Sequence, residues 1–319
     1  MQRRSDRGAF PAPPIPDESV SEPFPSTVPE PAHPSRRRGV HRFTVILLAA
    51  AVVGGLSVAL DPTPVAAGRQ PRAVIVLGPS GERMHENREQ AELLARQATR
   101  AGMRVTRVFH PRATWERVRT QTRGANLVIY LGHGNGWPSP YGPFQEATKD
   151  GFGLNPREGA SAWTTDWHGG NQIRQELRLA SNAVVILYYA CYSAGNSEPG
   201  RSTPSLKVAT RRVDNYAAAF LDEKVGASAV FAFWTTQSLN IPRRLMGKGH
   251  TMDDVFQTPG PFEGSAGGWV GRHDTYHPSA RTRFRRIHLD PHPNWGYVRA
   301  VAGKLQMTTN EWLGMAPPR

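Results

Sequence analysis

Runs of mainly apolar residues alternate with helix-forming stretches over much of the chain after residue 70. Five runs of five to eight residues, of the kind that form strands buried on both faces, cover residues 73–77, 105–109, 127–131, 183–190 and 227–234. The stretches between them predict helices at 82–101, 113–121 and 213–223. Strands that alternate with helices favour a mostly parallel sheet covered on both faces, which is an α/β sandwich.

The apolar run at residues 43–60 differs from the others because it contains 18 consecutive residues without a charge. As a helix it would be about 27 Å long, which is close to the hydrocarbon thickness of a bilayer. Four arginines stand directly before it, namely Arg36, Arg37, Arg38 and Arg42. The positive-inside rule therefore predicts a single transmembrane helix in the cell membrane, with residues 1–42 in the cytoplasm and the C-terminal bulk outside.

The segments on either side of this helix are not expected to belong to a folded domain. Residues 1–40 hold nine prolines, so residues 1–42 are expected to form a disordered, proline-rich tail. Residues 61–70 are expected to be a linker. Because Val65 and Ala67 have the small-residue form of a signal-peptidase site, a secreted form cleaved after Ala67 is the alternative. A leader of 42 residues ahead of the apolar run favours the uncleaved anchor.

The chain is strongly basic, and the excess is carried by arginine. It has 39 basic and 26 acidic side chains, a net charge of +13, and only five lysines. With 39% hydrophobic residues, 31 glycines and 28 prolines, the chain is not a collagen, a coiled coil or a polytopic membrane protein. It is compatible with a surface that binds anionic lipid or cell-wall polymers, although a diffuse excess is more often a solvated surface. No zinc finger, RNP or basic-zipper pattern is present, so no specific nucleic-acid partner is expected.

Cys191 is the single cysteine, so an internal disulfide is impossible and packing must stabilise the domain. The residue follows the apolar run at 183–190, and His133 follows the run at 127–131 within Gly132-His133-Gly134. In open α/β sheets, ligands bind beyond the carboxyl ends of the strands. If the two strands are neighbours, His133 and Cys191 meet there. The alternative is that Cys191 is a small buried apolar residue.

His133 and Cys191 have the chemistry of a nucleophile and its base. A thiolate is a strong nucleophile, and a nearby imidazole either lowers the pKa of the thiol or takes its proton. The same imidazole can protonate a leaving amine. The backbone N–H groups of Gly134 and Cys191 could form an oxyanion hole, since glycine lets backbone approach a substrate closely.

The motifs YLGHG at 130–134 and CYSAG at 191–195 resemble those of the caspase-like (clan CD) cysteine peptidases, which include caspases, metacaspases, legumains, gingipains and clostripain. The resemblance implies a caspase-like three-layer sandwich over residues 71–240 and an endopeptidase that needs no cofactor. It also implies that Cys191 is the nucleophile, His133 the general base and acid, and Gly134 an oxyanion donor. Peptide or protein substrates would be the partners.

The sequence also departs from the metacaspase pattern near the cysteine. Tyr189 stands where metacaspases have an aspartate that selects arginine or lysine, and Tyr192 replaces their second histidine. The long segment 135–172, rich in Gly, Pro and Trp, is expected to border the active site. We therefore expect substrate contacts from Tyr189, Trp234 and Asp166.

Three other functions remain open. The domain could be a catalytically silent caspase-like scaffold. It could be a module that binds cell-wall polymers or other polyanions, supported by the net charge and by the tryptophans Trp137, Trp163, Trp167 and Trp234. It could also bind a transition metal through C-terminal histidines, because His273 and His277, like His288 and His292, are spaced as metal ligands with Asp274 and Asp290 beside them.

Proline and arginine are frequent in the C-terminal segment, so residues 241–319 are expected to be a partly irregular, Arg/His-rich extension. Surface histidines in a loop are usually solvated, so these histidines are not assigned as metal ligands. No metal is expected among the predicted site residues.

Overall fold

The computed structural model describes residues 70–198, 200–234, 241–257, 286–292 and 296–314. The segments expected to be a cytoplasmic tail (1–42), a membrane helix (43–60) and, except for residue 70, a linker (61–70) lie outside the described residues. Within the part of the chain that is described, no helix has the length and apolar character needed to span a bilayer.

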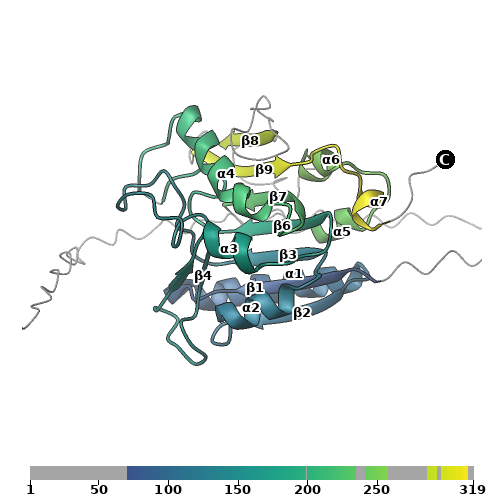
Figure 1. The fold of residues 1–319 in the computed structure, drawn as a ribbon, viewed down its shortest axis with the longest axis horizontal. Helices are drawn as coiled ribbons and strands as arrows, with labels where there is room; N and C mark the ends of the chain where they lie inside the picture. Colours follow the sequence, from purple (N-terminus) through teal and green to yellow (C-terminus); the bar gives the residue numbers. More distant parts are fainter. Residues whose placement is uncertain (1–69, 199, 235–240, 258–285, 293–295, 315–319) are drawn as a thin grey trace, which may run out of the picture. The chain divides into compact units, whose positions relative to one another are not determined.

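A seven-stranded mixed sheet forms the centre of the domain, with the strand order β2-β1-β3-β6-β7-β9-β8 (Figure 1). The strands from β2 to β7 in this order pair in parallel, and β9 pairs antiparallel with both β7 and β8. Their bounds are β1 Arg72–Leu77, β2 Arg104–Phe109, β3 Leu127–Leu131, β6 Ala183–Tyr188, β7 Ala227–Phe233, β8 Ile287–His292 and β9 Gly296–Gly303. The prediction of an α/β fold with a mostly parallel sheet is therefore confirmed.

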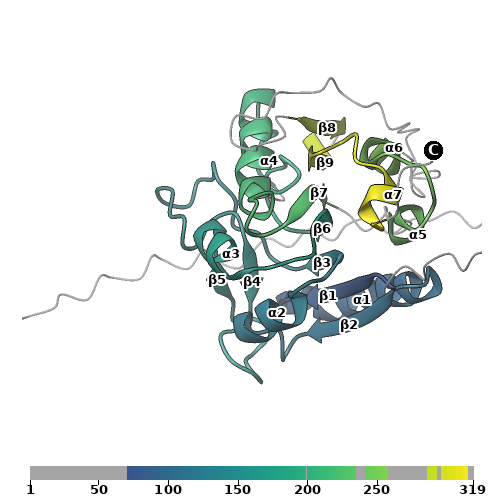
Figure 2. The ribbon, with the colours of Figure 1, turned by 45° about the vertical axis from the view of Figure 1, so that its right-hand side comes forward.

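Helices cover both faces of this sheet (Figure 2). On one face lie α2 (Trp115–Thr122), α3 (Gly170–Glu176) and α4 (Leu206–Phe220), and on the other lie α1 (Met84–Arg100), α5 (Ile241–Leu245), α6 (Met252–Gln257) and α7 (Thr309–Trp312). Alternate residues of β1 enter the two cores, with Val74 and Val76 on the α4 side and Ile75 on the α1 side. Because both faces are buried, the strands show continuous apolar runs.

Two predicted elements differ from the observed ones for local reasons. Strand β6 ends at Tyr188, before the predicted end at residue 190, because Tyr189 has a φ of 59° and leaves the extended conformation. Helix α4 begins at Leu206 and not at residue 213. The side chain of Ser205 accepts a hydrogen bond from the Val208 N–H and caps the helix there.

The described residues of the C-terminal segment 241–319 contribute to the same body as residues 71–240. Strand β9 is hydrogen-bonded to β7, for example with Phe231 opposite Val301, and α5, α6 and α7 pack on the α1 face. The compact unit that contains the sheet extends from Pro62 to Arg319. The antiparallel pair β8–β9 was not anticipated from the sequence, because proline and arginine interrupt its apolar pattern.

A short hairpin lies beside the main sheet within the long segment 135–172. It pairs β4 (Phe152–Leu154) antiparallel with β5 (Asp166–His168). Phe152 belongs to the core on the α4 side and packs against Phe220 with the rings tilted and their centroids 5.3 Å apart. The packing of Phe152 holds part of this long segment against the folded body.

Candidate active site

The His133 and Cys191 motifs leave the same edge of the sheet side by side. Strands β3 and β6 are parallel neighbours in which Leu131 is paired with Tyr188, and each motif follows the carboxyl end of its strand. The Gly132 N–H donates to the Tyr188 carbonyl oxygen at 3.4 Å, one residue beyond the last pair of the ladder. The expectation that the two strands are neighbours is therefore met.

The backbone around His133 is held by the hydroxyl of Tyr130. This hydroxyl lies 2.8 Å from the His133 carbonyl oxygen and accepts a hydrogen bond of 3.0 Å from the Gly153 N–H. Gly132 has a φ of 155°, and a Cβ there would lie 2.5 Å from the Tyr130 hydroxyl oxygen. Glycine is therefore required at residue 132 both for backbone conformation and for space.

The second glycine of the motif brings the two loops into direct contact. A Cβ on Gly134 would lie 2.4 Å from the Cys191 nitrogen and 2.5 Å from its carbonyl oxygen, so only hydrogen fits at this position. The backbone N–H groups of Gly134 and Cys191 both act to lower the pKa of the thiol. The two groups that the sequence predicted as oxyanion donors therefore both act electrostatically on Cys191.

The protonation states of the pair are set by burial more than by mutual attraction. Burial raises the pKa of the Cys191 thiol to about 12, and the negative charge of Glu198 adds to the rise. His133 is an exposed residue, yet partial burial of its ring lowers its pKa, and the positive charge of Arg83 lowers it further. Near pH 7 the resting site therefore holds a neutral thiol and a neutral imidazole, so general-base proton transfer remains the role open to His133.

Arg83 is a site residue that sequence reasoning missed. Its charge acts on both His133 and Cys191, lowering the pKa of each. Its guanidinium lies 4.4 Å from the ring centroid of Tyr189 and pairs with Glu86 at 3.3 Å. Arg83 ends a short 3-10 helix, η1 (Gly81–Arg83), that follows the carboxyl end of β1. Because β1 neighbours β3, the same edge rule that identified His133 could have identified this loop.

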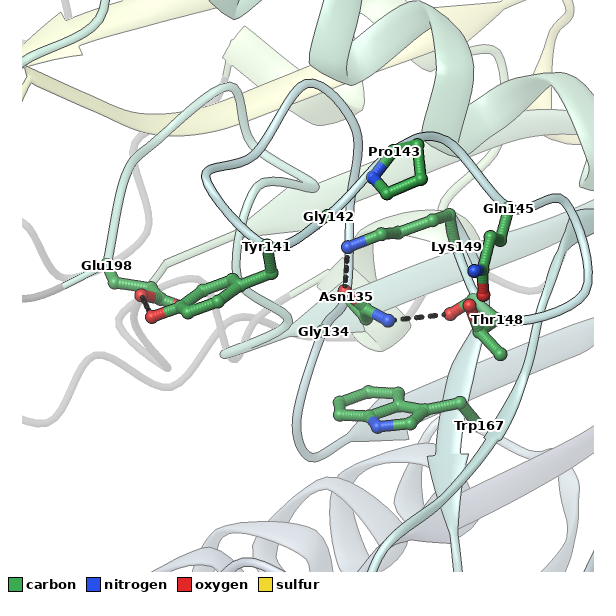
Figure 3. A pocket seen from close by; sticks show the side chains of 10 residues that line it. All are labelled: Gly134, Asn135, Tyr141, Gly142, Pro143, Gln145, Thr148, Lys149, Trp167 and Glu198. Carbon is green, nitrogen blue, oxygen red and sulfur yellow. Dashed lines mark hydrogen bonds between the residues drawn. The ribbon is translucent and has the colours of Figure 1, made fainter. Parts of the chain in front are cut away.

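A pocket of about 370 Å³ opens beside Gly134 (Figure 3). Loop residues far apart in the sequence line it, namely Gly134, Asn135, Tyr141, Gly142, Pro143, Gln145, Thr148, Lys149, Trp167 and Glu198. Most of them belong to the segment 135–172. That segment therefore lies next to one of the candidate oxyanion donors.

The pocket carries one buried cation and one carboxylate among its described lining residues. Lys149 is 4% exposed, and its ammonium donates to the side-chain oxygens of Asn135 at 2.6 Å and Ser139 at 3.1 Å. Burial lowers the pKa of Lys149, and the negative charge of Glu198 opposes this change. Glu198 in turn accepts a hydrogen bond of 2.6 Å from the Tyr141 hydroxyl (Figure 3).

The three residues expected to contact substrate lie elsewhere along this edge. Tyr189 separates β6 from Cys191 and stacks under Arg83. Trp234 directly follows β7, and its N–H donates to the Val298 carbonyl at 2.7 Å. Asp166 is exposed on β5, with its carboxylate 3.3 Å from the His168 ring. None of the three is among the described residues that line the Gly134 pocket, whereas Trp167 is.

The metal-binding alternative falls largely on residues that are not described. His273, Asp274 and His277 lie outside the described residues, as does the side chain of His292. His288 is buried, with ring nitrogens 3.4 Å from Asp253 and 3.6 Å from Asp290. Arg299 forms an ion pair with Asp290. Among the described residues, no group of three or more His, Cys, Asp or Glu side chains could hold a metal ion.

No protein-family model and no curated protein sequence matches this chain.

Proposed function

We propose that the protein is a membrane-anchored, extracytoplasmic caspase-like cysteine peptidase that uses a Cys191–His133 dyad. The observation that carries the proposal is the contact between the Gly134 and Cys191 backbones at the carboxyl ends of the parallel neighbours β3 and β6. This contact joins the two motifs whose resemblance to clan CD peptidases suggested the activity. The backbone N–H groups of the same two residues lower the pKa of the thiol, which supports the proposal.

In this proposal His133 takes the thiol proton as Cys191 attacks the carbonyl carbon of a peptide bond. A bond forms between the sulfur and that carbon, and the N–H groups of Gly134 and Cys191 hold the resulting oxyanion. The C–N bond then breaks as His133 gives its proton to the departing amine. Water hydrolyses the thioester with His133 as base, which releases the acid and restores the thiol.

The two pKa shifts disfavour a preformed thiolate–imidazolium pair, so the proposal requires proton transfer to His133 during attack. A thiol with a pKa of about 12 is almost entirely protonated at neutral pH, and an imidazole with a lowered pKa is unprotonated but a weaker base, so the developing charge must be stabilised for the transfer to occur. The nucleophile is thus activated during attack, when the developing charge is met by the backbone donors.

The pocket beside Gly134 is the proposed site for a substrate side chain. It adjoins the proposed oxyanion donor and is lined by the aromatic ring of Trp167, the carboxylate of Glu198 and the Tyr141 hydroxyl. Most of its described lining residues are polar, so the proposed substrate side chain is a polar one.

Peptide-library cleavage by the purified full chain tests the activity. Wild type should cleave a defined set of bonds, while Cys191→Ala and His133→Ala should each abolish turnover. His85→Ala is the matched control, because His85 is exposed on α1 and pairs with Glu89 on the surface. Cleavage that persists in Cys191→Ala would overturn the proposal.

The silent scaffold is the second candidate, and the raised thiol pKa is the observation that favours it. A scaffold needs no thiolate, so a buried and protonated cysteine would satisfy it. The two candidates differ in one measurement. A substrate-derived acyl group trapped on Cys191, detected by mass spectrometry after rapid acid quench, supports the peptidase and excludes the scaffold.

The proposed location rests on the apolar run 43–60 and the arginines before it. Protease treatment of intact cells should remove an epitope placed at the C-terminus and spare one placed at the N-terminus. The opposite pattern would overturn the topology. Loss of the N-terminal epitope from the mature chain would indicate cleavage after Ala67.

A further inference from the structure

A second cavity, of about 260 Å³, lies at the same edge of the sheet but beside the outer strand β2. Four arginines and one histidine line it together with a single acidic residue; its described lining is Arg88, Glu92, Arg107, Phe109, His110, Pro111, Arg112 and Arg117. We infer that this arginine pocket binds a phosphate group, independently of the proposed peptidase activity.

The arginine pocket carries an excess of three positive charges among its described lining residues. Arg107 is paired with Glu92 at 3.1 Å, and Arg112 reaches Glu158 only at 4.0 Å on the exposed surface. Exposed pairs of this kind are weak, and the excess of three charges already takes Glu92 into account. Within the part of the chain that is described, neither Arg88 nor Arg117 has a carboxylate within ion-pairing distance. An anion would therefore relieve repulsion among these side chains.

The neighbouring groups hold part of the arginine pocket in place. Arg88 extends from α1, and one of its Nη atoms donates to the His110 carbonyl oxygen at 2.5 Å. The His110 ring is fixed by the Asn155 side chain at 2.9 Å. Burial and the charge of Arg88 lower the pKa of His110. Two walls of the pocket are thus ordered before any ligand binds.

Both the size and the donor type of the pocket match a phosphate group. Its volume lies below the range of about 300–1,000 Å³ usual for drug-sized ligands, so it suits a small head group. Arginine presents a planar fork of N–H donors that matches two phosphate oxygens at once. A carboxylate could use one such fork, but several arginines around one cavity suit an anion that accepts hydrogen bonds on several sides.

The binding test uses the full chain in a non-ionic detergent, with inorganic phosphate as the probe in isothermal titration calorimetry. Wild type should bind one phosphate saturably. Arg112→Gln combined with Arg117→Gln should weaken binding by about tenfold or more, because each charge-assisted hydrogen bond that is lost reduces the binding free energy. Both side chains are exposed, so the fold should survive, and thermal melting verifies this.

Two further variants separate a built site from diffuse charge. Arg211→Gln combined with Arg243→Gln removes the same charge from exposed positions on α4 and α5, and phosphate affinity should change by less than about twofold. Arg112→Lys combined with Arg117→Lys keeps the charge but removes the fork, and binding should still weaken several-fold. Absence of saturable binding in wild type, or equal weakening by the pocket pair and the control pair, would overturn the inference.

The source of the phosphate group is resolved by a second probe. Stronger binding of inorganic phosphate than of dimethyl phosphate would assign the pocket to free phosphate or a monoester. Equal binding would assign it to the phosphodiester of a polymer or lipid head group. Phosphate binding should persist in Cys191→Ala, because the pocket adjoins β2 and not β6. Failure of peptide hydrolysis would therefore leave this inference standing.

Discussion

The backbones of Gly134 and Cys191 lie in contact. They are so close that a Cβ added to Gly134 would lie 2.4 Å from the Cys191 nitrogen. The two residues are separated by a long stretch of sequence that includes β4, β5, α3 and β6. Parallel pairing of β3 with β6 brings them together at one edge of the sheet. The N–H groups of both residues then lower the pKa of the thiol, which is the arrangement from which the proposed chemistry follows.

Gly134→Ala should destabilise the protein and abolish turnover. The new methyl group would force apart two backbone segments, and overpacking of this kind costs about 1–3 kcal/mol. Urea unfolding and peptide turnover measure the two effects. Gly170→Ala is the matched control, since its Cβ would meet its nearest atoms, the first of them the Ala219 Cβ, at ordinary contact distances of 3.4–3.9 Å. A Gly134→Ala protein with wild-type stability and turnover would contradict the observed contact.

Alkylation of Cys191 should be slow at neutral pH and rise into the alkaline range. With the thiol pKa raised to about 12 by burial, the thiolate fraction increases about tenfold for each pH unit below that value. Iodoacetamide labelling followed by mass spectrometry between pH 7 and pH 9 should therefore show a rise of about 100-fold. A rate that is already maximal near pH 7 would indicate a preformed thiolate–imidazolium pair.

Removing the charge of Glu198 and removing that of Arg83 should shift the pKa of the Cys191 thiol in opposite directions. Glu198 raises the pKa of Cys191 and Arg83 lowers it, so Glu198→Gln should speed alkylation at a fixed pH and Arg83→Gln should slow it, each by a few-fold. Arg83 also lowers the pKa of His133, so Arg83→Gln should move protonation of His133 to higher pH. The proton NMR signal of the His133 ring measures that titration. Shifts of the same sign in both variants would refute this electrostatic account.

Tyr130→Phe should reduce stability and turnover together. The hydroxyl accepts from the Gly153 N–H and contacts the His133 carbonyl, so its loss leaves buried polar groups unpaired, at a cost of about 1–3 kcal/mol. Tyr141→Phe is the control for stability, because Tyr141 is half exposed and its hydroxyl meets Glu198 at the surface. Unfolding and steady-state kinetics are measured on both. Equal losses of stability in the two variants would mean that Tyr130 does not hold the His133 loop.

Part of the candidate site could be read from the sequence because it depends on local rules. His133 and Cys191 each follow an apolar run, and side chains past the ends of parallel strands collect at one edge. The same rule applies to Arg83 after β1 and to the arginine pocket after β2. Neither loop carries a recognisable motif, so the sequence alone does not indicate a site there. The substrate contacts predicted for Tyr189, Trp234 and Asp166 rest on the family resemblance or on nearness to a motif or strand end, neither of which specifies which loop lines a pocket.

The sequence by itself determined the central strands, the layered α/β class and the placement of a histidine and the single cysteine after neighbouring strands at one edge of the sheet. These features follow from periodicity, chain connectivity and strand direction, all of which are local or nearly local. Tertiary structure alone decided the antiparallel addition of β9 to β7, the pocket shared by Lys149 and Glu198, and the raised pKa of Cys191. Each of these depends on which distant segments pack together and how much water they exclude, and burial of the thiol outweighs the donors that the motif supplies.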